Sequence, residues 1–400
     1  MFVSTQVFKH LRQCSQTILR RTGSPLSAAY RRQLSCCTQA APLNEDTLAV
    51  QSQLPAPLTQ LTTDEEAMRD IVRRLADEKV RPLVRQMDES AVMDQSVIDA
   101  LFANGLMSVN IDTAYGGTGG NTFSLMVVIE ELAKACASVS AFVGIHSTLA
   151  VQTLISFGTD DQKRRYLPVL AQRSAGSFCI SEPNAGSDAF ALKTTATREG
   201  DHWVINGAKS WITNAKEAQV FVVFANADPR AGHRGITCFI VDRHTPGLTV
   251  ERPENKLGIR CSSTCPVTLD GVRVPECNVV GQVGQGYKYA IQTLNVGRIG
   301  IAAQMLGLAE GCFQEAVRYT FDRKQFGRRI FDFQALQHQI SRAATEIESA
   351  RLLVYNSARL RDAGMPFVKE ASMAKYYASE VATRTTSKAV EWLGGVGFTK

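Results

Sequence analysis

The spacing of apolar residues divides the chain into a helical region, a strand region and a second helical region. Between residues 62 and 176 the spacing is helical. Thr63-Asp-Glu-Glu66 predicts a helix start, because a hydroxyl side chain caps free amides and acids favour the first turn. Val97–Gly105 predicts a short helix that ends at a glycine. Ser124–Lys134 and Ser138–Phe157 are apolar enough to form buried helices.

Between residues 177 and 282 the pattern changes to short apolar runs separated by turn residues. Asn206-Gly207 lies between two apolar-rich runs and predicts a β-hairpin, and Asp270-Gly271 predicts a second one. Further predicted strands are residues 220–225, 235–241, 265–269 and 272–274. Several short strands joined by turn residues indicate a small β-barrel or sandwich.

A second helical region begins near Gly286. Its apolar residues recur at steps of four and three, which forms one stripe suited to an antiparallel bundle or to a subunit contact. The stripe comprises Leu336, Ile340, Ala343, Ile347, Ala350 and Val354. We therefore predict an α+β fold class with an N-terminal helical domain (61–176), a middle β-barrel domain (177–282) and a C-terminal helical bundle (283–400).

The first 44 residues contain basic side chains and no Asp or Glu. The basic residues are Lys9, Arg12, Arg20, Arg21, Arg31 and Arg32. This Arg-, Ser- and Thr-rich composition is typical of a mitochondrial transit peptide. We predict a transit peptide over residues 1–34, cleaved after Leu34, a polar linker over residues 35–60, and location in the mitochondrial matrix. A disordered basic tail is the alternative.

The charge and hydropathy of the rest of the chain exclude two classes of function. The formal net charge is +6, but beyond the N-terminal segment 38 basic residues face 38 acidic ones. A neutral chain lacks the basic surface on which nucleic-acid binding depends, so we expect no nucleic-acid partner. No apolar run reaches the roughly 18–20 residues that span a bilayer, so we expect no membrane span.

Ten cysteines and six histidines are scattered through the chain. The spacing of Cys261 and Cys265 differs from that of a CxxC redox pair, and no second Cys/His pair completes a zinc site, so we expect no metal. Two glycine clusters, Tyr115–Gly120 and Gly281–Gly286, lack the strand–loop–helix context of nucleotide-binding loops.

The segments Phe178–Asp188 and Ser210–Thr213 carry the strongest chemical pattern. The first reads Phe-Cys-Ile-Ser-Glu-Pro-Asn-Ala-Gly-Ser-Asp. Its small residues, hydroxyls and amides would let a planar or phosphorylated cofactor approach the main chain closely. The second segment, Ser-Trp-Ile-Thr, adds an indole and two hydroxyls. Together the two segments resemble the flavin-binding part of the acyl-CoA dehydrogenase family.

The resemblance covers about residues 60–400 and includes four further motifs. These are Asn255–Arg260, Asn295–Gln304, Asp322–Gly327 and Glu391–Gly395. Within the family, Glu254–Pro266 and Gly286–Asn295 are most similar to the short/branched-chain subfamily. The resemblance implies FAD-dependent α,β-dehydrogenation of short branched-chain acyl-CoA, such as 2-methylbutyryl-CoA, in branched-chain amino-acid and fatty-acid catabolism. It also implies a homotetramer that passes electrons to an electron-transfer flavoprotein.

The resemblance also assigns site residues position by position. The FAD-contacting positions correspond to Phe178, Ile180, Ser181, Gly186, Ser187, Trp211, Ile212, Thr213, Arg323, Gln334, Glu391, Gly394 and Gly395. The acyl-CoA-contacting positions correspond to Ser187, His233, Tyr287, Asn295 and Arg298. Arg323 corresponds to an arginine that binds the FAD pyrophosphate of a neighbouring subunit, so the resemblance implies a cofactor site built from two chains.

Several of these assignments have a plainer alternative. Trp211 can be a buried strand aromatic, and Arg323 can be a solvated arginine at a helix end. Gly394 and Gly395 can end a helix. His233 can be a solvated loop residue.

Dehydrogenation requires a carboxylate that removes the α-proton of the thioester. In most of the family this base is the glutamate of a Tyr-Glu-Gly segment, expected beyond Lys400, and in a minority it stands at the position of Gly297. Glu182 and Glu391 correspond to cofactor-side positions instead. We therefore expect no catalytic base within the chain, as in a fragment of a longer enzyme or a short, catalytically impaired form that binds FAD and acyl-CoA. Isovaleryl or short straight-chain specificity and an acyl-CoA oxidase are the remaining alternatives.

Overall fold

The computed structural model describes residues 57–399, and the first elements in this part of the chain are helices. α4 begins at Thr63, and Thr62 is its N-cap. The Thr62 hydroxyl accepts from the amide of Glu65 at 3.3 Å, and the Glu65 carboxylate accepts from the amide of Thr62 at 2.9 Å. This capping box confirms the predicted helix start to within one residue. The predicted transit peptide (1–34) and most of the predicted linker (35–60) lie outside the described residues.

All elements before the sheet in the described part of the chain are helices. They are α4 (Thr63–Leu75), η1 (Ala76–Val80), η2 (Arg81–Leu83), α5 (Val84–Ser90), α6 (Gln95–Ala103), η3 (Thr113–Tyr115), α7 (Thr122–Ala135), α8 (Ala137–Ile145), η4 (His146–Val151), α9 (Gln152–Phe157) and α10 (Asp160–Gln172). α8, η4 and α9 follow one another without a break, and η4 is a π-helical turn, which is common near functional sites.

This continuous helix, Ala137–Phe157, is long and apolar enough by length and composition to cross a membrane. The sequence-based prediction that the chain has no such run was therefore wrong. The helix carries no Asp, Glu, Lys or Arg. In the fold, 83 % of its most apolar stretch is buried against other elements, as in the core helix of a globular domain.

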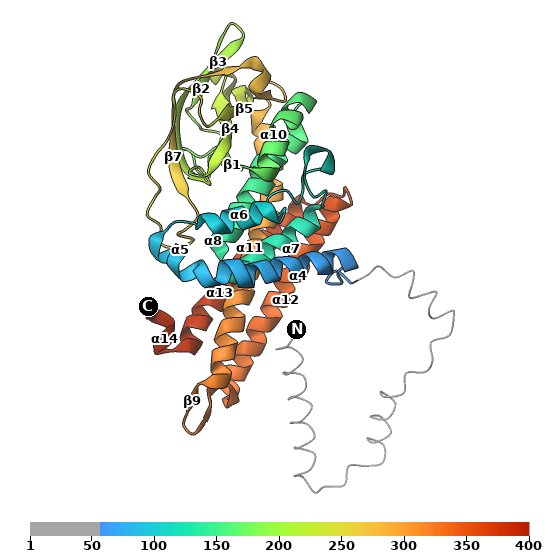
Figure 1. Cartoon of the computed structure of the whole chain (residues 1–400), viewed down its shortest axis with the longest axis vertical. Coiled ribbons are helices and arrows are strands. Elements are labelled where there is room, and N and C mark those ends of the chain that lie inside the picture. Colours follow the sequence, from blue (N-terminus) through green and yellow to red (C-terminus); the bar gives the residue numbers. More distant parts are fainter. Residues whose placement is uncertain (1–56, 400) are drawn as a thin grey trace, which may run out of the picture. The chain divides into compact units, whose positions relative to one another are not determined.

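Eight strands form one mixed sheet in the middle of the chain (Figure 1). They are β1 (Ala175–Cys179), β2 (Thr195–Glu199), β3 (His202–Thr213), β4 (Ala218–Asn226), β5 (Ile236–Asp242), β6 (Leu248–Val250), β7 (Thr264–Pro275) and β8 (Val279–Val280). Their order is β6-β7-β3-β2-β4-β5-β8, and β1 pairs in parallel with β4. β4 is buried on both faces, because Val222 joins the apolar cluster that contains Leu170 of α10 while Val223 joins the cluster of Trp203.

Both predicted hairpin turns were wrong, because the two dipeptides lie inside long paired strands. β3 and β7 pair along their lengths, and their register shifts between Ile205 and Gly207. The side-chain oxygen of Asn206 accepts from the amide of Gly271 at 2.7 Å. Asn206-Gly207 and Asp270-Gly271 therefore lie opposite each other at a break in the regular β3–β7 pairing. There the Asn206 side chain, rather than a backbone carbonyl, accepts the hydrogen bond from the Gly271 amide.

Helices dominate again after the sheet. They are α11 (Gly286–Asp322), η7 (Ile330–Asp332), α12 (Gln334–Asp362), α13 (Val368–Leu393) and α14 (Gly395–Phe398), and a hairpin of β9 (Lys324–Gln325) and β10 (Arg328–Arg329) follows α11. The predicted α12 stripe is confirmed, because Leu336 is half-buried and its other members are buried. The order of helices, sheet and helices confirms the predicted α+β fold class (Figure 1).

α11 connects the sheet to the far end of the helical bundle. Its first residue, Gly286, lies against β5, where an added Cβ would be 2.8 Å from the carbonyl carbon of Thr237. Its 37 residues extend about 55 Å. The β9–β10 hairpin at the other end of α11 therefore lies far from the sheet (Figure 1).

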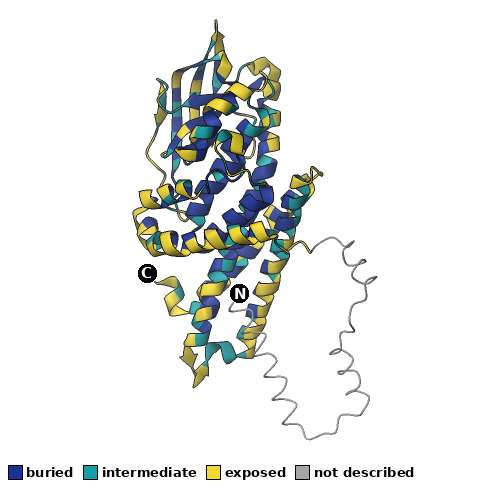
Figure 2. Ribbon diagram, turned by 45° about the vertical axis from the view of Figure 1, so that its right-hand side comes forward, coloured by how far each residue is buried: buried dark blue, intermediate teal, exposed yellow. Residues whose placement is uncertain are grey.

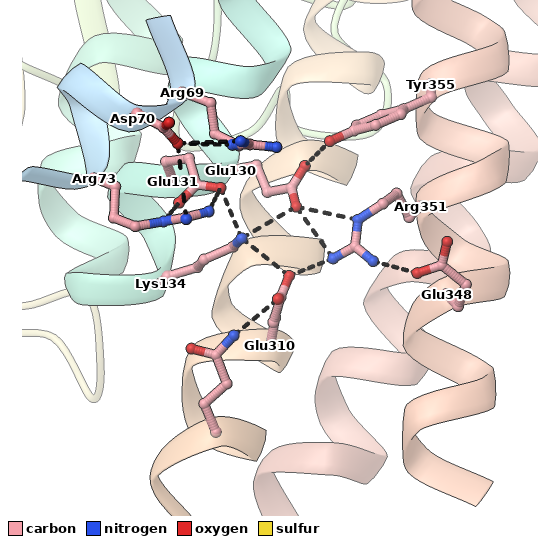
Figure 3. Close-up of polar contacts among 11 residues, drawn as sticks. Arg69, Asp70, Arg73, Glu130, Glu131, Lys134, Glu310, Glu348, Arg351 and Tyr355 are labelled. Atoms are coloured by element: carbon pink, nitrogen blue, oxygen red, sulfur yellow. Dashed lines mark hydrogen bonds and ion pairs between the residues drawn. The ribbon is translucent and has the colours of Figure 1, made fainter. Parts of the chain in front are cut away.

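A buried ionic network joins α7, α11 and α12 (Figure 3). Glu130 of α7 accepts from Arg351 of α12 at 3.2 Å and from the Tyr355 hydroxyl at 2.9 Å. Lys134 of α7 lies 3.1 Å from Glu310 of α11, which also pairs with Arg351. Burial alone would raise the pKa of Glu310, but Lys134 and Arg351 outweigh burial and lower that pKa. Removal of one partner would therefore leave an uncompensated buried charge among the helices.

Candidate cofactor and substrate site

The predicted cofactor residues near the sheet come from two adjacent segments. Residues 178–187 include the end of β1 and the loop after it, and residues 211–213 end β3. The amide of Ser210 donates to the carbonyl of Ser181 at 2.9 Å. Folding therefore places the two sequence motifs side by side.

Trp211 lies at an irregularity of β3 and faces solvent. The β3–β7 register shifts between Lys209 and Ile212, and Trp211 has a left-handed backbone with a φ of 58°. A bulge of this kind turns a side chain away from the direction it takes in a regular strand. Trp211 is 55 % exposed, so the alternative interpretation of a buried strand aromatic is wrong.

The other residues of the two segments fit a planar cofactor with a polar edge. Ser181 and Thr213 are half-buried hydroxyl residues, one on each segment. An added Cβ at Gly186 would meet no atom within 4 Å, so the backbone there borders open space. The apolar members of the predicted set, Phe178, Ile180 and Ile212, are buried in the apolar clusters of the sheet. An exposed indole, nearby hydroxyls and open glycine backbone are a set that suits the ring and ribityl chain of FAD.

The predicted substrate residues on α11 form two small groups. Tyr287 is in edge-to-face contact with His233 of η5 (Pro229–Gly235), and their ring centroids are 4.8 Å apart. Farther along the helix, Arg298 donates to the Asn295 side-chain oxygen at 2.5 Å. Tyr287 and Arg298 lie about three turns apart and therefore on one face of α11. Ser187, which belongs to both predicted sets, is exposed.

A pocket of about 280 Å³ opens beside Asn295. It is lined by Gln152, Ser156, Phe157, Gln292, Thr293, Asn295, Val296, Arg361, Phe367 and Val368. Arg361 donates to the Gln152 side-chain oxygen at 2.7 Å and to the Thr122 hydroxyl, and burial lowers the pKa of its guanidinium. Sequence reasoning missed Arg361, because it belongs to no motif and only folding brings the end of α12 to α9.

The other predicted cofactor residues lie at the opposite end of the bundle. They are Arg323, Gln334, Glu391, Gly394 and Gly395, and all of them are exposed. The indole nitrogen of Trp392 donates to the Gln339 side-chain oxygen at 3.1 Å, which joins the end of α13 to the start of α12. α11 separates this group from the sheet, so a single chain does not bring the two groups of predicted residues together.

Glu182, an acidic residue of the Phe178–Asp188 motif, is buried and hydrogen-bonded inside the protein. Its carboxylate accepts from Lys209 Nζ at 2.7 Å and from the Thr194 hydroxyl at 2.5 Å. Burial alone would raise the pKa of Glu182, but the contacts with Lys209 and Thr194 outweigh burial and lower that pKa. A carboxylate that is ionised and surrounded by donors is a structural group rather than a free base.

The remaining two candidate positions for a base also lack a free carboxylate beside Trp211. Glu391 pairs with Lys388 at 2.6 Å at the far end of the bundle. Gly297 lies against η4, where an added Cβ would be 2.9 Å from a terminal carbon of Leu149.

Three family models match successive parts of the chain. Residues 62–174 match the N-terminal domain of acyl-CoA dehydrogenase, residues 177–272 match its middle domain and residues 284–400 match its C-terminal domain. The mitochondrial short/branched chain specific acyl-CoA dehydrogenase of Bos taurus is 58 % identical over 345 residues, which are 86 % of this chain and 80 % of that protein.

Two solved structures extend the similarity to three dimensions. Butyryl-CoA dehydrogenase from Megasphaera elsdenii is 37 % identical with a TM-score of 0.84, over 85 % of this chain and 90 % of that chain. A glutaryl-CoA dehydrogenase from Mycobacterium smegmatis, in complex with FADH2, is 29 % identical with a TM-score of 0.80, over 85 % and 86 % of the two chains.

Proposed function

Because the chain belongs to the acyl-CoA dehydrogenase family, we propose that it dehydrogenates short branched-chain acyl-CoA at the α,β bond. The family makes the protein an oxidoreductase with FAD as its cofactor. We take 2-methylbutyryl-CoA as the representative substrate, in branched-chain amino-acid and fatty-acid catabolism. The name of the bovine relative, at 58 % identity, supports a branched substrate more than the butyryl-CoA enzyme does at 37 % identity.

One structural observation carries this function: the stretch of β3 that exposes Trp211 is hydrogen-bonded, through the Ser210 amide, to the loop of Ser181 that also carries the open backbone of Gly186. When bound, FAD supplies the hydride acceptor, which no side chain can provide. Residues 178–187 would line its ring and ribityl chain, Trp211 would pack beside the ring, and Thr213 would donate a hydrogen bond to it.

The substrate would lie along the sheet-side half of α11. His233 and Tyr287, already in contact, would bind the CoA part together with Ser187. Arg298 has the neutral Asn295 and Ser372 as its hydrogen-bond acceptors, so its positive charge is available for an acyl-CoA group. The carboxylate that accepts the α-proton stays a prediction, because none of Glu182, Glu391 and Gly297 provides a free carboxylate beside Trp211.

The separation of the two groups of cofactor residues supports a site shared between subunits. Arg323, Gln334, Glu391, Gly394 and Gly395 would bind the FAD of a neighbouring chain, with Arg323 on the pyrophosphate. We therefore propose a homotetramer. The bovine relative is mitochondrial, and we propose the mitochondrial matrix as the location and an electron-transfer flavoprotein as the electron acceptor.

The direct test is anaerobic addition of 2-methylbutyryl-CoA to the purified 400-residue protein while the visible flavin band is recorded. We expect loss of the oxidised band, faster than with butyryl-CoA or isovaleryl-CoA. Faster reduction by butyryl-CoA or isovaleryl-CoA would contradict the branched 2-methyl preference. Hydrogen peroxide production in air at the rate of turnover would instead indicate an oxidase.

A second candidate is a protein that binds FAD and acyl-CoA without turnover, because Glu182 and Glu391 are both paired with lysines and position 297 is a glycine. This candidate predicts a yellow protein whose flavin spectrum shifts when 2-methylbutyryl-CoA is added but does not bleach. That outcome would contradict dehydrogenation by these 400 residues.

A further inference from the structure

Glu182 and Lys209 form a buried ion pair between the two segments that the proposed function assigns to FAD. The Lys209 side chain is 0 % exposed and the Glu182 side chain is 6 % exposed. Lys209 Nζ lies 2.7 Å from the carboxylate and donates also to the Ile180 carbonyl at 3.4 Å. Replacement of such a pair by apolar residues of similar size is often neutral or stabilising, so its presence calls for another explanation than stability.

The Glu182 carboxylate gathers donors from two other segments. One of its oxygens accepts from Lys209 of β3, from the Thr194 hydroxyl at 2.5 Å and from the Thr194 amide at 3.0 Å. The other oxygen accepts from the Lys193 amide at 2.6 Å. The backbones of Glu182 and Ala185 exchange hydrogen bonds of 3.0 and 3.1 Å, which closes the loop on itself. The carboxylate therefore ties this loop both to the start of β2 and to β3.

Lys209 stands at the point where β3 leaves its regular pairing. It pairs with Val267 of β7, and the next residue of β3 paired with β7 is Ile212. Trp211 therefore belongs to a short stretch of β3, Ser210 and Trp211, that is not paired with β7 and that begins directly after the buried Lys209. The Ser210 amide donates to Ser181, so the same stretch is also bound to the loop that Glu182 holds.

We propose that the Glu182–Lys209 pair is a positioning element, which fixes Trp211 relative to Ser181 at the separation that the flavin requires. The proposal rests on the proposed function, because it takes FAD as the ligand of these segments. Both residues act through their neighbours: Lys209 through the strand that displays Trp211, and Glu182 through the loop that carries Ser181. When the contacts that support a binding site are removed, the residues that touch the ligand are held less precisely, even though they are still present.

The test compares Lys209→Met, Glu182→Gln and the double variant Glu182→Leu/Lys209→Met. The single variants leave one partner of the pair unmatched, whereas the double variant removes both charges and is the one expected to fold best. Two readouts are used: the Kd for FAD by flavin titration, and quenching of tryptophan fluorescence by acrylamide in the FAD-free protein. Trp203 and Trp392 are both 5 % exposed, so acrylamide quenching reports mainly on Trp211.

We expect the folded double variant to bind FAD at least tenfold more weakly and to change the acrylamide quenching constant at least twofold. Lys134→Met is the matched control, because the Lys134 side chain is only 12 % exposed and is also paired with glutamates but lies among the helices. It should lower stability and leave both readouts of the folded protein unchanged. A folded double variant with the Kd and quenching of the natural protein would overturn the proposal. If the natural protein binds no FAD, the proposed function fails, and the quenching comparison still decides whether the pair positions Trp211.

Discussion

The two groups of proposed cofactor residues lie on the sheet and at the hairpin end of the helical bundle, and they are built in different ways. At the sheet end, the proposed FAD-binding segments are joined to each other by a backbone hydrogen bond and to the core through the buried Lys209. At the hairpin end, Arg323 and Gln334 are exposed, and the elements around them are largely exposed as well (Figure 2).

This difference fits the proposed shared site, in which the sheet end is formed within one chain and the hairpin end would present side chains to the FAD of a neighbouring chain. A substitution of a buried residue that supports the sheet end should therefore change both folding stability and cofactor binding. A substitution at the hairpin end should change cofactor binding alone. The following predictions test this contrast.

Lys209→Met should have the largest effect on stability. It leaves the buried Glu182 carboxylate without its counter-charge, so we expect the free energy of unfolding to fall by about 3–5 kcal/mol. Urea unfolding measures the change. The hairpin-end comparison is Lys388→Met, which breaks an exposed pair with Glu391 and should cost less than about 1 kcal/mol. Equal losses of unfolding free energy in the two variants would contradict the proposed difference between the sheet end and the hairpin end.

His146, which is hydrogen-bonded to β1 of the sheet, should make the unfolding free energy of the protein depend on pH. Its Nδ1 accepts from the Gly176 amide at 2.9 Å and its Nε2 donates to the Met107 carbonyl at 2.9 Å, so the folded ring is neutral. Burial lowers the pKa of His146 to about 4. The unfolded chain takes up this proton near pH 6.5, so stability should fall as the pH falls from 6.5 to 4, by about 3 kcal/mol in total.

The measurement is urea unfolding between pH 7 and pH 4, in the natural protein and in His146→Gln. Acidic residues also contribute in this range, and comparison of the two proteins removes their part. The variant should lose less stability on acidification. Parallel pH profiles of the two proteins would show that His146 is not the group responsible.

Arg323→Ala should weaken FAD binding without affecting folding. Loss of a hydrogen bond to a charged phosphate corresponds to about 1.5–3 kcal/mol, or roughly a 10- to 100-fold rise in Kd. The unfolding free energy should stay within about 0.5 kcal/mol, because Arg323 is exposed. Lys324→Ala on the same hairpin is the control. An unchanged Kd for FAD would support the alternative interpretation of Arg323 as a solvated helix-end residue.

Trp211→Phe should have the smallest effect. The exposed ring adds little to the core, so stability should change by less than about 0.5 kcal/mol. A smaller aromatic ring beside the flavin should weaken FAD binding by about 1 kcal/mol or less, measured by flavin titration. A large loss of stability would show that the indole supports the fold rather than the ligand.

Local patterns predicted most of the helices, and they failed where two strands met. The capping box of Thr62 and Glu65 and the α12 stripe depend on residues a few positions apart, and both were found. The dipeptide Asn206-Gly207 has the composition of a hairpin turn, but its Asn side chain bonds to Gly271, 65 positions away. Turn propensity was outweighed by a longer ladder between β3 and β7.

The same limit applies to the proposed site. The motifs around Trp211 were recognisable from residue order, and folding placed them together as expected. The pairing of Glu182 with Lys209 could not be predicted from residue order, because a motif shows that an acid is present and does not show which lysine lies close to it. Arg361 was missed for the same reason, since its pocket is formed by segments that belong to no common motif.

The sequence by itself therefore determined the order of elements, the family and the residue types of the proposed flavin site, because helical periodicity, capping and motif spacing are properties of neighbouring residues. Only the tertiary structure decided that Glu182 is paired with Lys209, that Trp211 faces solvent from an irregular strand, and that α11 separates the two groups of proposed cofactor residues. These features depend on distances between segments far apart in the chain, and such distances are set by packing of the whole core.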